Sequence, residues 1–447
     1  MKTIRVLLTA VLMLSFASLW AQTETPKAYN FNLEQCINYA YEHQTALLNA
    51  GIDQKIADAK VKETIGIGLP QINGTADLRD FLKIPVSLVP AEIFGGTAGT
   101  FQPVQFGVKY NSSVGVSVNQ LLFSGSYIVG LQASKTFKEL SQRAYNRSKI
   151  ETNVAVKKAF YMVLVNNKRV ELLDANISQL KAQLDQTQAL FDNGFAEKID
   201  ADRLKVLFNN LTTEKTNVLR SLELGKAMLK FQMGMPVENE LTLNGSIEAI
   251  KLDEVDLMAD SSTYKNRIEY NLAETQLKLN QLDLKRYKSE YLPSLAAFGN
   301  SSLQYQNNSF ADLYDRSFPT TVIGLQLNVP IFSGGQRLQK VKQAQFTVLK
   351  SNNDLYNAKN AINLDIKNSI TTYKNSVTSL ESQQKNLDLA SEVLRVTKIK
   401  YEQGVGSSIE VTQAQTSLKE AENNYINALY DALISKVDTE KATGLIK

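Results

Sequence analysis

Two long stretches of the chain carry apolar residues at the seven-residue spacing of a coiled coil. Residues 126–192 contain no Pro, and residues 336–402 contain neither Pro nor Gly. In the first stretch, apolar residues recur every seven positions, at Val156, Val163, Val170, Ile177, Leu184 and Phe191. This spacing predicts a coiled-coil helix. At ~1.5 Å per residue each stretch makes a helix of about 100 Å, which needs other helices to cover its apolar stripe.

The second stretch repeats the pattern with a weaker companion series. Apolar or aromatic residues stand 210 positions later, at Ile366, Tyr373, Leu380, Leu387, Leu394 and Tyr401. The companion positions are small or polar: Ser369, Ser376, Gln383, Ala390 and Thr397. We therefore expect a looser seam in this half, with one edge facing water.

Two shorter stretches alternate with the period of a β-strand. Apolar residues alternate with Gly, Gln and Asn over 323–329, and with Gly, Ser and Asn over 114–119. Such alternation suits a membrane β-barrel strand, with lipid on one face and a wet lumen on the other. A soluble, half-buried strand has the same pattern, so the alternation by itself leaves both readings open.

The chain is a duplicated unit. Residues 191–194 (FDNG) correspond to 401–404 (YEQG) at an offset of 210, and 122–125 (LFSG) correspond to 331–334 (IFSG) at an offset of 209. The predicted division is a signal peptide at 1–21, a first repeat at 22–236, a connecting segment at 237–261 and a second repeat at 262–447. The first repeat would hold strands at about 69–82 and 112–123 and helices at about 126–192 and 197–233. The second would hold strands at about 292–305 and 321–332 and helices at about 336–402 and 408–443.

Four strands per chain are too few to close a membrane barrel, which needs about eight or more. Closure therefore requires several chains. Two chains would supply about eight strands, and a barrel of that size is filled by its own side chains. Three chains would supply about twelve and leave a channel. The sequence thus predicts an oligomer.

The N-terminus has the layout of a secretory signal peptide. Lys2 and Arg5 precede an apolar run at 6–14, and small residues lead to an expected cleavage after Ala21. A membrane anchor is the alternative, which the shortness of the apolar run disfavours. Cys36 lies beyond the cut without a lipidation motif, so we expect a buried thiol.

Composition narrows the chemistry. The chain is 43% hydrophobic and holds one His and one Cys, which argues against a metal or other cofactor and against an enzyme. Its net charge of +4 is too small to indicate a nucleic-acid partner. No Gly-rich phosphate loop follows a strand, so ATP binding is not indicated.

Over about residues 30–445 the chain resembles the TolC family of outer-membrane efflux and secretion ducts. The resemblance rests on the duplication, on VPIFSGG at 329–335 before a long helix, and on YxxGxxxxIE at 401–410. The sequence LEQCINYA at 33–40 is also similar to the family's opening helix, where Ala usually stands in place of Cys36.

The resemblance implies an α+β membrane protein that forms a homotrimer. A barrel of about 12 strands would lie in outer-membrane lipid and continue as a periplasmic helical tunnel. It implies passive export in a tripartite efflux or type I secretion system, with a periplasmic adaptor protein and an inner-membrane RND or ABC transporter as partners. The alternative is a coiled-coil spacer or adaptor of the cell envelope, which accounts for the helices but not for the alternating strands.

The family's periplasmic gate carries acidic residues three apart after the second-half turn. Here Glu410 matches, but Gln413 takes the second place. The corresponding first-half residues are Asp200 and Arg203, with Asp202 nearby. Rings of carboxylates in a trimer would favour cations, less so than two full acidic rings. Alternatively, Asp200 and Glu410 only stabilise the helix N-termini near which they lie.

Two further features remain. Gly194, Gly404 and Gly406 predict tight, positive-φ turns between helices, and the resemblance makes these turns the periplasmic tips that contact the adaptor. Residues 83–109 have no counterpart in the second half and are nearly uncharged. We expect an external loop there, either packed over the barrel mouth or in contact with an outside partner, with a plain flexible loop as the alternative.

Overall fold

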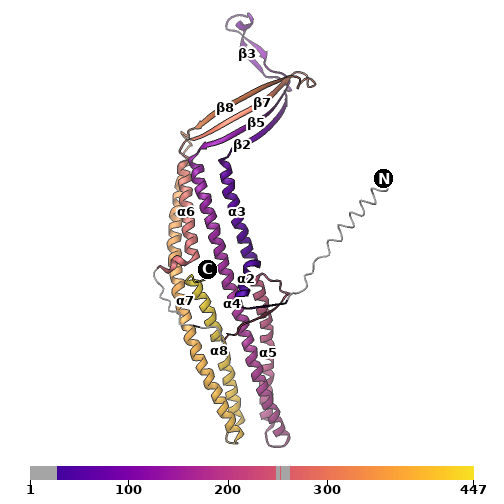
Figure 1. The fold of residues 1–447 in the computed structure, drawn as a ribbon, viewed down its shortest axis with the longest axis vertical. Helices are drawn as coiled ribbons and strands as arrows, with labels where there is room; N and C mark the ends of the chain where they lie inside the picture. Colours follow the sequence, from indigo (N-terminus) through magenta and orange to yellow (C-terminus); the bar gives the residue numbers. More distant parts are fainter. Residues whose placement is uncertain (1–27, 248–251, 253–261, 447) are drawn as a thin grey trace, which may run out of the picture. The chain divides into compact units, whose positions relative to one another are not determined.

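The structure is a computed structural model that describes residues 28–247, 252 and 262–446 (Figure 1). The predicted signal peptide lies outside this part, as do residues 248–251 and 253–261 of the predicted connecting segment. Within the described ranges, no helix is both long enough and apolar enough to cross a membrane.

The chain folds into two compact units, and each draws on both sequence repeats. The helical unit comprises Met1–Asn49, Ser148–Thr263 and Asn363–Lys447, and the sheet unit comprises Ala50–Arg147 and Tyr264–Ile362. The predicted repeats therefore describe the duplication in the sequence rather than the compact bodies, and their boundaries stay a prediction.

Paired long helices build the helical unit. Its helices are α5 (Lys198–Met233), α8 (Ser408–Ala442), and the parts of α4 (Gly125–Asp192) and α7 (Gln336–Glu402) that fall within it. The short helix α2 (Leu33–His43) begins at a capping box formed by Asn32 and Gln35. Strand β1 (Ala28–Phe31) runs parallel to β6 (Glu240–Leu243), which comes from the predicted connecting segment.

The heptad positions form the contacts between helices. Leu173 and Leu180 of α4 pack against Leu204, Leu211 and Val218 of α5. In the second pair, Leu394 of α7 packs against Val411 and Ala414 of α8. The companion series of α7 is less covered: Ser369 is buried, whereas Ser376, Gln383, Ala390 and Thr397 are half-buried. The looser seam expected from the sequence is therefore present.

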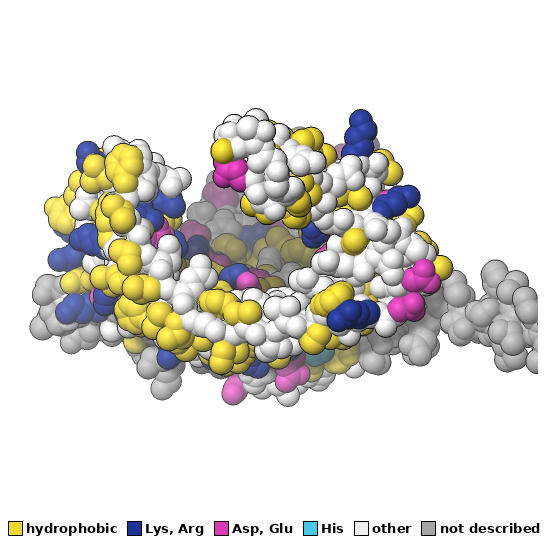
Figure 2. Space-filling view, turned by 90° about the horizontal axis from the view of Figure 1, so that it is seen from above, with side chains coloured by type: hydrophobic (Ala, Val, Ile, Leu, Met, Phe, Trp, Pro, Cys, Tyr) yellow, Lys and Arg dark blue, Asp and Glu magenta, His cyan; other side chains and the backbone are white. Residues whose placement is uncertain are grey.

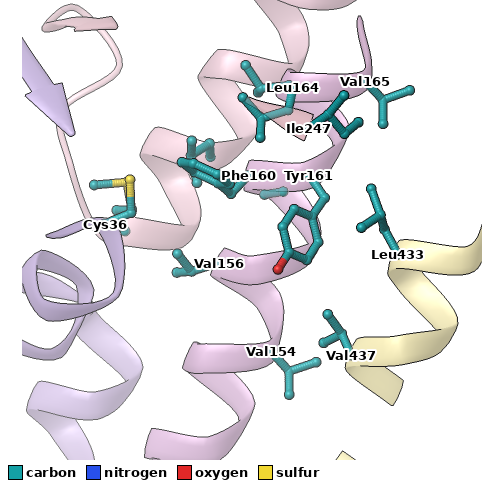
Figure 3. Packing of buried hydrophobic residues seen from close by; sticks show 14 of the residues in the cluster. Cys36, Val154, Val156, Phe160, Tyr161, Leu164, Val165, Ile247, Leu433 and Val437 are labelled. Atoms are coloured by element: carbon teal, nitrogen blue, oxygen red, sulfur yellow. The ribbon is translucent and has the colours of Figure 1, made fainter. Parts of the chain in front are cut away.

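The main core of the helical unit joins α4, α8, α5 and α2 (Figure 3). Phe160 and Leu164 of α4 and Leu433 of α8 are buried there. Cys36 is also fully buried, as expected, and burial raises the pKa of its thiol to about 12. The thiol is therefore protonated and unreactive at neutral pH.

A four-stranded antiparallel sheet dominates the sheet unit. The strands lie in the order β2 (Gln71–Asp80), β5 (Tyr110–Phe123), β7 (Ser294–Asn307) and β8 (Ser317–Asn328). Helix α3 (Thr45–Ile67) leads into β2, and α6 (Ile268–Ser289) leads into β7. Among the described strands, β2 and β8 each lack a partner on one side.

The register of this sheet sorts its side chains into two faces. Ile323 pairs with Gly299, which pairs with Val118, which pairs with Ile72, so the four lie on one face. On the other face, Asn300 pairs with Ser117, and Ser117 pairs with Asn73. The apolar face is open: Ile72 is 69% exposed and Ile323 is 85% exposed. A half-buried soluble strand would have its apolar face covered by protein, so the exposure favours a face that meets lipid.

The segment without a counterpart in the second half folds into a second, small sheet. Strands β3 (Val86–Pro90) and β4 (Phe101–Gln105) form an antiparallel hairpin, with the 3-10 helix η2 (Ala91–Phe94) near its tip. Gly95 and Gly99 take positive φ and let the chain turn back. The segment is therefore an ordered hairpin rather than the plain loop weighed above.

Candidate functional site

Two glycine turns join the helix pairs of the helical unit. Gly194 follows α4 with φ 81°, and Gly404 follows α7 with φ 75°. In both turns the residue after the glycine donates a backbone hydrogen bond back into the helix, from Phe195 to Leu190 and from Val405 to Lys400. These bonds satisfy carbonyl groups at the helix ends, as in other glycine-terminated helices.

Gly406 differs from this expectation. It does not take a positive φ, so the prediction of a left-handed turn is wrong at this position. A Cβ atom there would lie 3.0 Å from the backbone nitrogen of Tyr401. A side chain at 406 would be crowded because the chain passes close to the end of α7, whereas the backbone conformation does not require glycine there.

Asp200 lies in the first turn of α5 and connects the two turns. Ser408, at the start of α8, donates a hydrogen bond from its Oγ to Asp200 Oδ1. Arg203 Nη1 lies 3.5 Å from the same carboxylate oxygen, and the Asp200 side chain is only 19% exposed. The Asp200 charge is thus largely compensated within the protein.

Glu410 lies in the first turn of α8 in a different setting. Ser407 precedes the helix and accepts a hydrogen bond from the Glu410 backbone nitrogen at 3.3 Å. The Glu410 side chain is exposed, as are those of Gln413 and Asp202. The five predicted gate residues therefore divide into an exposed group (Glu410, Gln413 and Asp202) and a half-buried ion pair (Asp200 and Arg203).

A cavity of about 510 Å³ lies beside the turns, between the last turns of α4 and α7. Tyr401 and Lys398 line it. Burial, and secondarily the charge of Asp200, raise the pKa of Tyr401. Burial lowers the pKa of Lys398, although Glu402 opposes that change. The region near the turns is therefore polar and partly shielded from water.

Farther from the turns, polar side chains tie α8 to its neighbours. Lys419 Nζ lies 2.5 Å from Glu214 Oε2 of α5, and Gln415 Nε2 donates to Gln183 Oε1 of α4 at 2.6 Å. Asn176 Nδ2 of α4 donates to Glu422 Oε2 at 2.5 Å. Burial raises the pKa of Glu422, and the Asn176 hydrogen bond partly offsets this.

These contacts between helices were not predicted from the sequence, although the sequence around Glu422 indicates one of them. Glu422 lies on the apolar stripe of α8, four residues after Leu418 and four before Ile426. A carboxylate on such a stripe indicates a buried polar contact. The Ser408–Asp200 contact had no such signal, because it joins residues from different repeats.

Comparison with known proteins identifies relatives along nearly the whole chain. A family model described as outer membrane efflux protein matches residues 264–445. The outer membrane protein TolC of Vibrio cholerae is 22% identical over 421 residues, covering 93% of this chain and 91% of the relative. The alkaline protease secretion protein AprF of Pseudomonas aeruginosa is 21% identical over 301 residues, covering 66% of this chain and 61% of the relative.

Solved structures share the fold across nearly the whole chain. The outer membrane channel CmeC of Campylobacter jejuni has a TM-score of 0.75 at 16% identity and covers 95% of this chain and 90% of its own. CusC, whose structures describe transmembrane channel formation, has a TM-score of 0.77 at 14% identity, with 95% of both chains covered. The chain is thus similar to the TolC family of outer membrane efflux proteins.

These solved structures confirm the predicted fold class, a chain of duplicated strand pairs and long coiled-coil helices. The matches to outer membrane proteins along nearly the whole chain identify it as an outer membrane protein. Its relatives are channel proteins rather than enzymes.

Proposed function

We propose that three copies of this chain form the exit duct of a tripartite efflux or type I secretion system. The two-faced sheet is the observation that carries the proposal. Its apolar face has exposed apolar side chains on all four strands, and its other face is mostly polar, with Asn, Ser and Thr on it beside Phe298, Phe318 and Val322. In a membrane barrel the apolar face would contact lipid and the polar face would contact water, so each face would lie in an environment that suits its side chains. A soluble envelope spacer would leave the apolar face in water.

The edges of the sheet support an oligomer. Strands β2 and β8 end the described sheet with unpaired sides, and open edges are not tolerated in the hydrocarbon region. Pairing β8 of one copy with β2 of the next would close a barrel of about 12 strands from three copies. The helices that lead into the sheet would then extend into the periplasm.

The helix turns are the proposed gate and docking site. Three copies of Glu410 would place exposed carboxylates around a narrow opening and favour cations. Phe195 and Val405, at equivalent places in the two turns, are 81% and 78% exposed. Exposed apolar residues on turns suit a protein partner, here a periplasmic adaptor linked to an inner-membrane RND or ABC transporter.

Transport through such a duct is passive, and the partner pump selects the substrate. Relatives similar in sequence carry names from both processes, antibiotic efflux and protease secretion. One type of exit duct that works with different pumps would account for both processes.

Single-channel recording of the purified mature protein in a planar bilayer tests the proposal. We expect a detergent-stable trimer that gives discrete, cation-biased openings. A soluble monomer that does not insert would contradict the duct. A trimer that stays silent both as wild type and with Asp200→Ala, which releases the tie between the turns, would also contradict it.

A further inference from the structure

The insertion hairpin, residues 86–105, presents one apolar face to its surroundings. The register places Val86, Leu88 and Pro90 opposite Gln105, Pro103 and Phe101, so these six side chains share a face. Leu88 is 68% exposed and Phe101 is 64% exposed. Five of the six residues on this face are apolar, and none is charged. The other face carries Ser87, Val89, Gln102 and Val104, of which the two valines are half-buried.

The hairpin is held in shape by its own hydrogen bonds. The backbone nitrogen of Ala91 donates to Thr100 at 2.9 Å, and that of Gly96 donates to Ala91 at 2.9 Å. Glu92 carries the only charge between Val86 and Gln105, and its Oε1 accepts from the Gly99 nitrogen at 2.9 Å. The Glu92 carboxylate therefore stabilises the turn of the hairpin. The apolar face belongs to an ordered element.

The position of the hairpin follows from the chain path. Strand β2 leaves α3 and ends at the hairpin, and β5 returns from the hairpin to α4. The hairpin therefore lies at the end of the sheet away from these helices, as Figure 1 also shows. In the proposed duct, this is the outer end of the barrel.

Two features indicate what covers the apolar face. Pro90 and Pro103 lie in the hairpin strands and cannot donate backbone hydrogen bonds, which disfavours the addition of a further strand at an edge. The face also has five apolar side chains, whereas a stable interface between independent proteins uses about 20–30 residues a side. It is therefore too small to capture a free partner. A small contact can still form between chains that the barrel already holds together, because their effective concentration is high.

We propose that the apolar faces of the three hairpins pack against one another across the outer mouth of the barrel and narrow the exit. This inference rests on the proposed trimer. The hairpin continues directly from β2 at the outer end of each copy, so the three hairpins would stand around the same mouth and face one another across it. Figure 2 looks from above onto the end of the sheet unit at which the hairpin lies in Figure 1, and hydrophobic side chains are visible in this view.

Disulfide cross-linking tests the contact. The chain has a single cysteine, Cys36, which is fully buried, so an introduced cysteine is the only exposed thiol. We would introduce Leu88→Cys on the apolar face, with the adjacent Ser87→Cys on the opposite face as the matched control. Phe101→Cys and Gln102→Cys form a second pair on the other strand, should the first fail to fold.

After oxidation of the purified trimer with copper–phenanthroline, we expect Leu88→Cys to give a dimer-sized band several-fold faster than Ser87→Cys. We also expect Leu88→Ser combined with Phe101→Ser to raise the single-channel conductance. An intact, conducting trimer in which both cysteines link at equal rates would overturn the hairpin contact and leave the duct standing. Cross-linking in outer membranes to a different protein would likewise overturn it in favour of an outside partner. Loss of the trimer itself would defeat the proposed function and this inference together.

Discussion

The two helix turns occupy equivalent places in the two repeats, yet the acidic residues that follow them lie in different environments. Asp200 and Glu410 are 210 residues apart, each in the first turn of its helix. Asp200 is tied to Ser408 and Arg203, whereas Glu410 is exposed. Glu197 gives α5 no side-chain cap, whereas Ser407 caps α8. Duplication thus preserved the fold of the turn while one carboxylate became a structural link and the other stayed open to solvent.

The largest expected effect concerns ion preference. If only the exposed carboxylate faces the passage, Glu410→Gln should remove most of the cation preference, because it discharges the ring that three copies would form. The reversal potential in a salt gradient across a planar bilayer measures this. Glu420→Gln, an exposed carboxylate farther along α8, is the control and should leave the potential unchanged. An unchanged potential in Glu410→Gln as well would refute the gate assignment.

The second effect concerns the free energy of unfolding and the contact between Asp200 and Ser408. Asp200→Ala should cost about 1–2 kcal/mol, because it removes a half-buried acceptor and leaves Ser408 and Arg203 without it. Ser408→Ala should cost less, and the double variant should cost little more than Asp200→Ala. Denaturant unfolding of the three variants measures the costs. Fully additive costs would show that the hydrogen bond contributes nothing.

The third effect distinguishes the glycines. Gly194→Ala and Gly404→Ala should each cost about 1–2 kcal/mol, because both residues take positive φ. Position 196, the counterpart of Gly406, already carries Ala. Gly406→Ala should nevertheless destabilise the second turn, because its Cβ would approach the Tyr401 backbone. Thermal unfolding compares the three, and a neutral Gly406→Ala would mean that the two turns are interchangeable.

The smallest effect depends on pH. Burial raises the pKa of Glu422 in the folded state, so protonation favours folding: its contribution is present below the usual carboxyl pKa and is lost as pH rises through the raised value. Glu422→Gln should therefore raise the melting temperature by about 1–2 °C at pH 7, with the gain fading toward pH 4. Its counterpart in α5 is the exposed Thr212, and Thr212→Val provides a control without pH dependence. A gain that does not vary with pH would contradict the burial of a charge.

The hydrophobic periodicity alone predicted the long helices and the strands of the main sheet, because it repeats over many residues in each of them. The heptads of α4 and α7 and the alternation in β5 and β8 recur often enough to identify helix and strand without tertiary information. The order in the 83–109 segment was missed, since a hairpin of five-residue strands with prolines resembles a loop in sequence. Gly406 was misjudged because a close approach between Gly406 and Tyr401 has no local signature.

The sequence by itself determined the duplication, the long helices, the two-faced strands and the positions of the turns, because each follows from periodicity within one segment. Tertiary structure alone decided that Asp200 is compensated while Glu410 is exposed, that Glu422 is half-buried beside Asn176, and that the insertion presents a single apolar face. These are properties of contacts between segments far apart in the chain. Burial and pairing set the energy of a charge, and both arise only when the helices and strands come together.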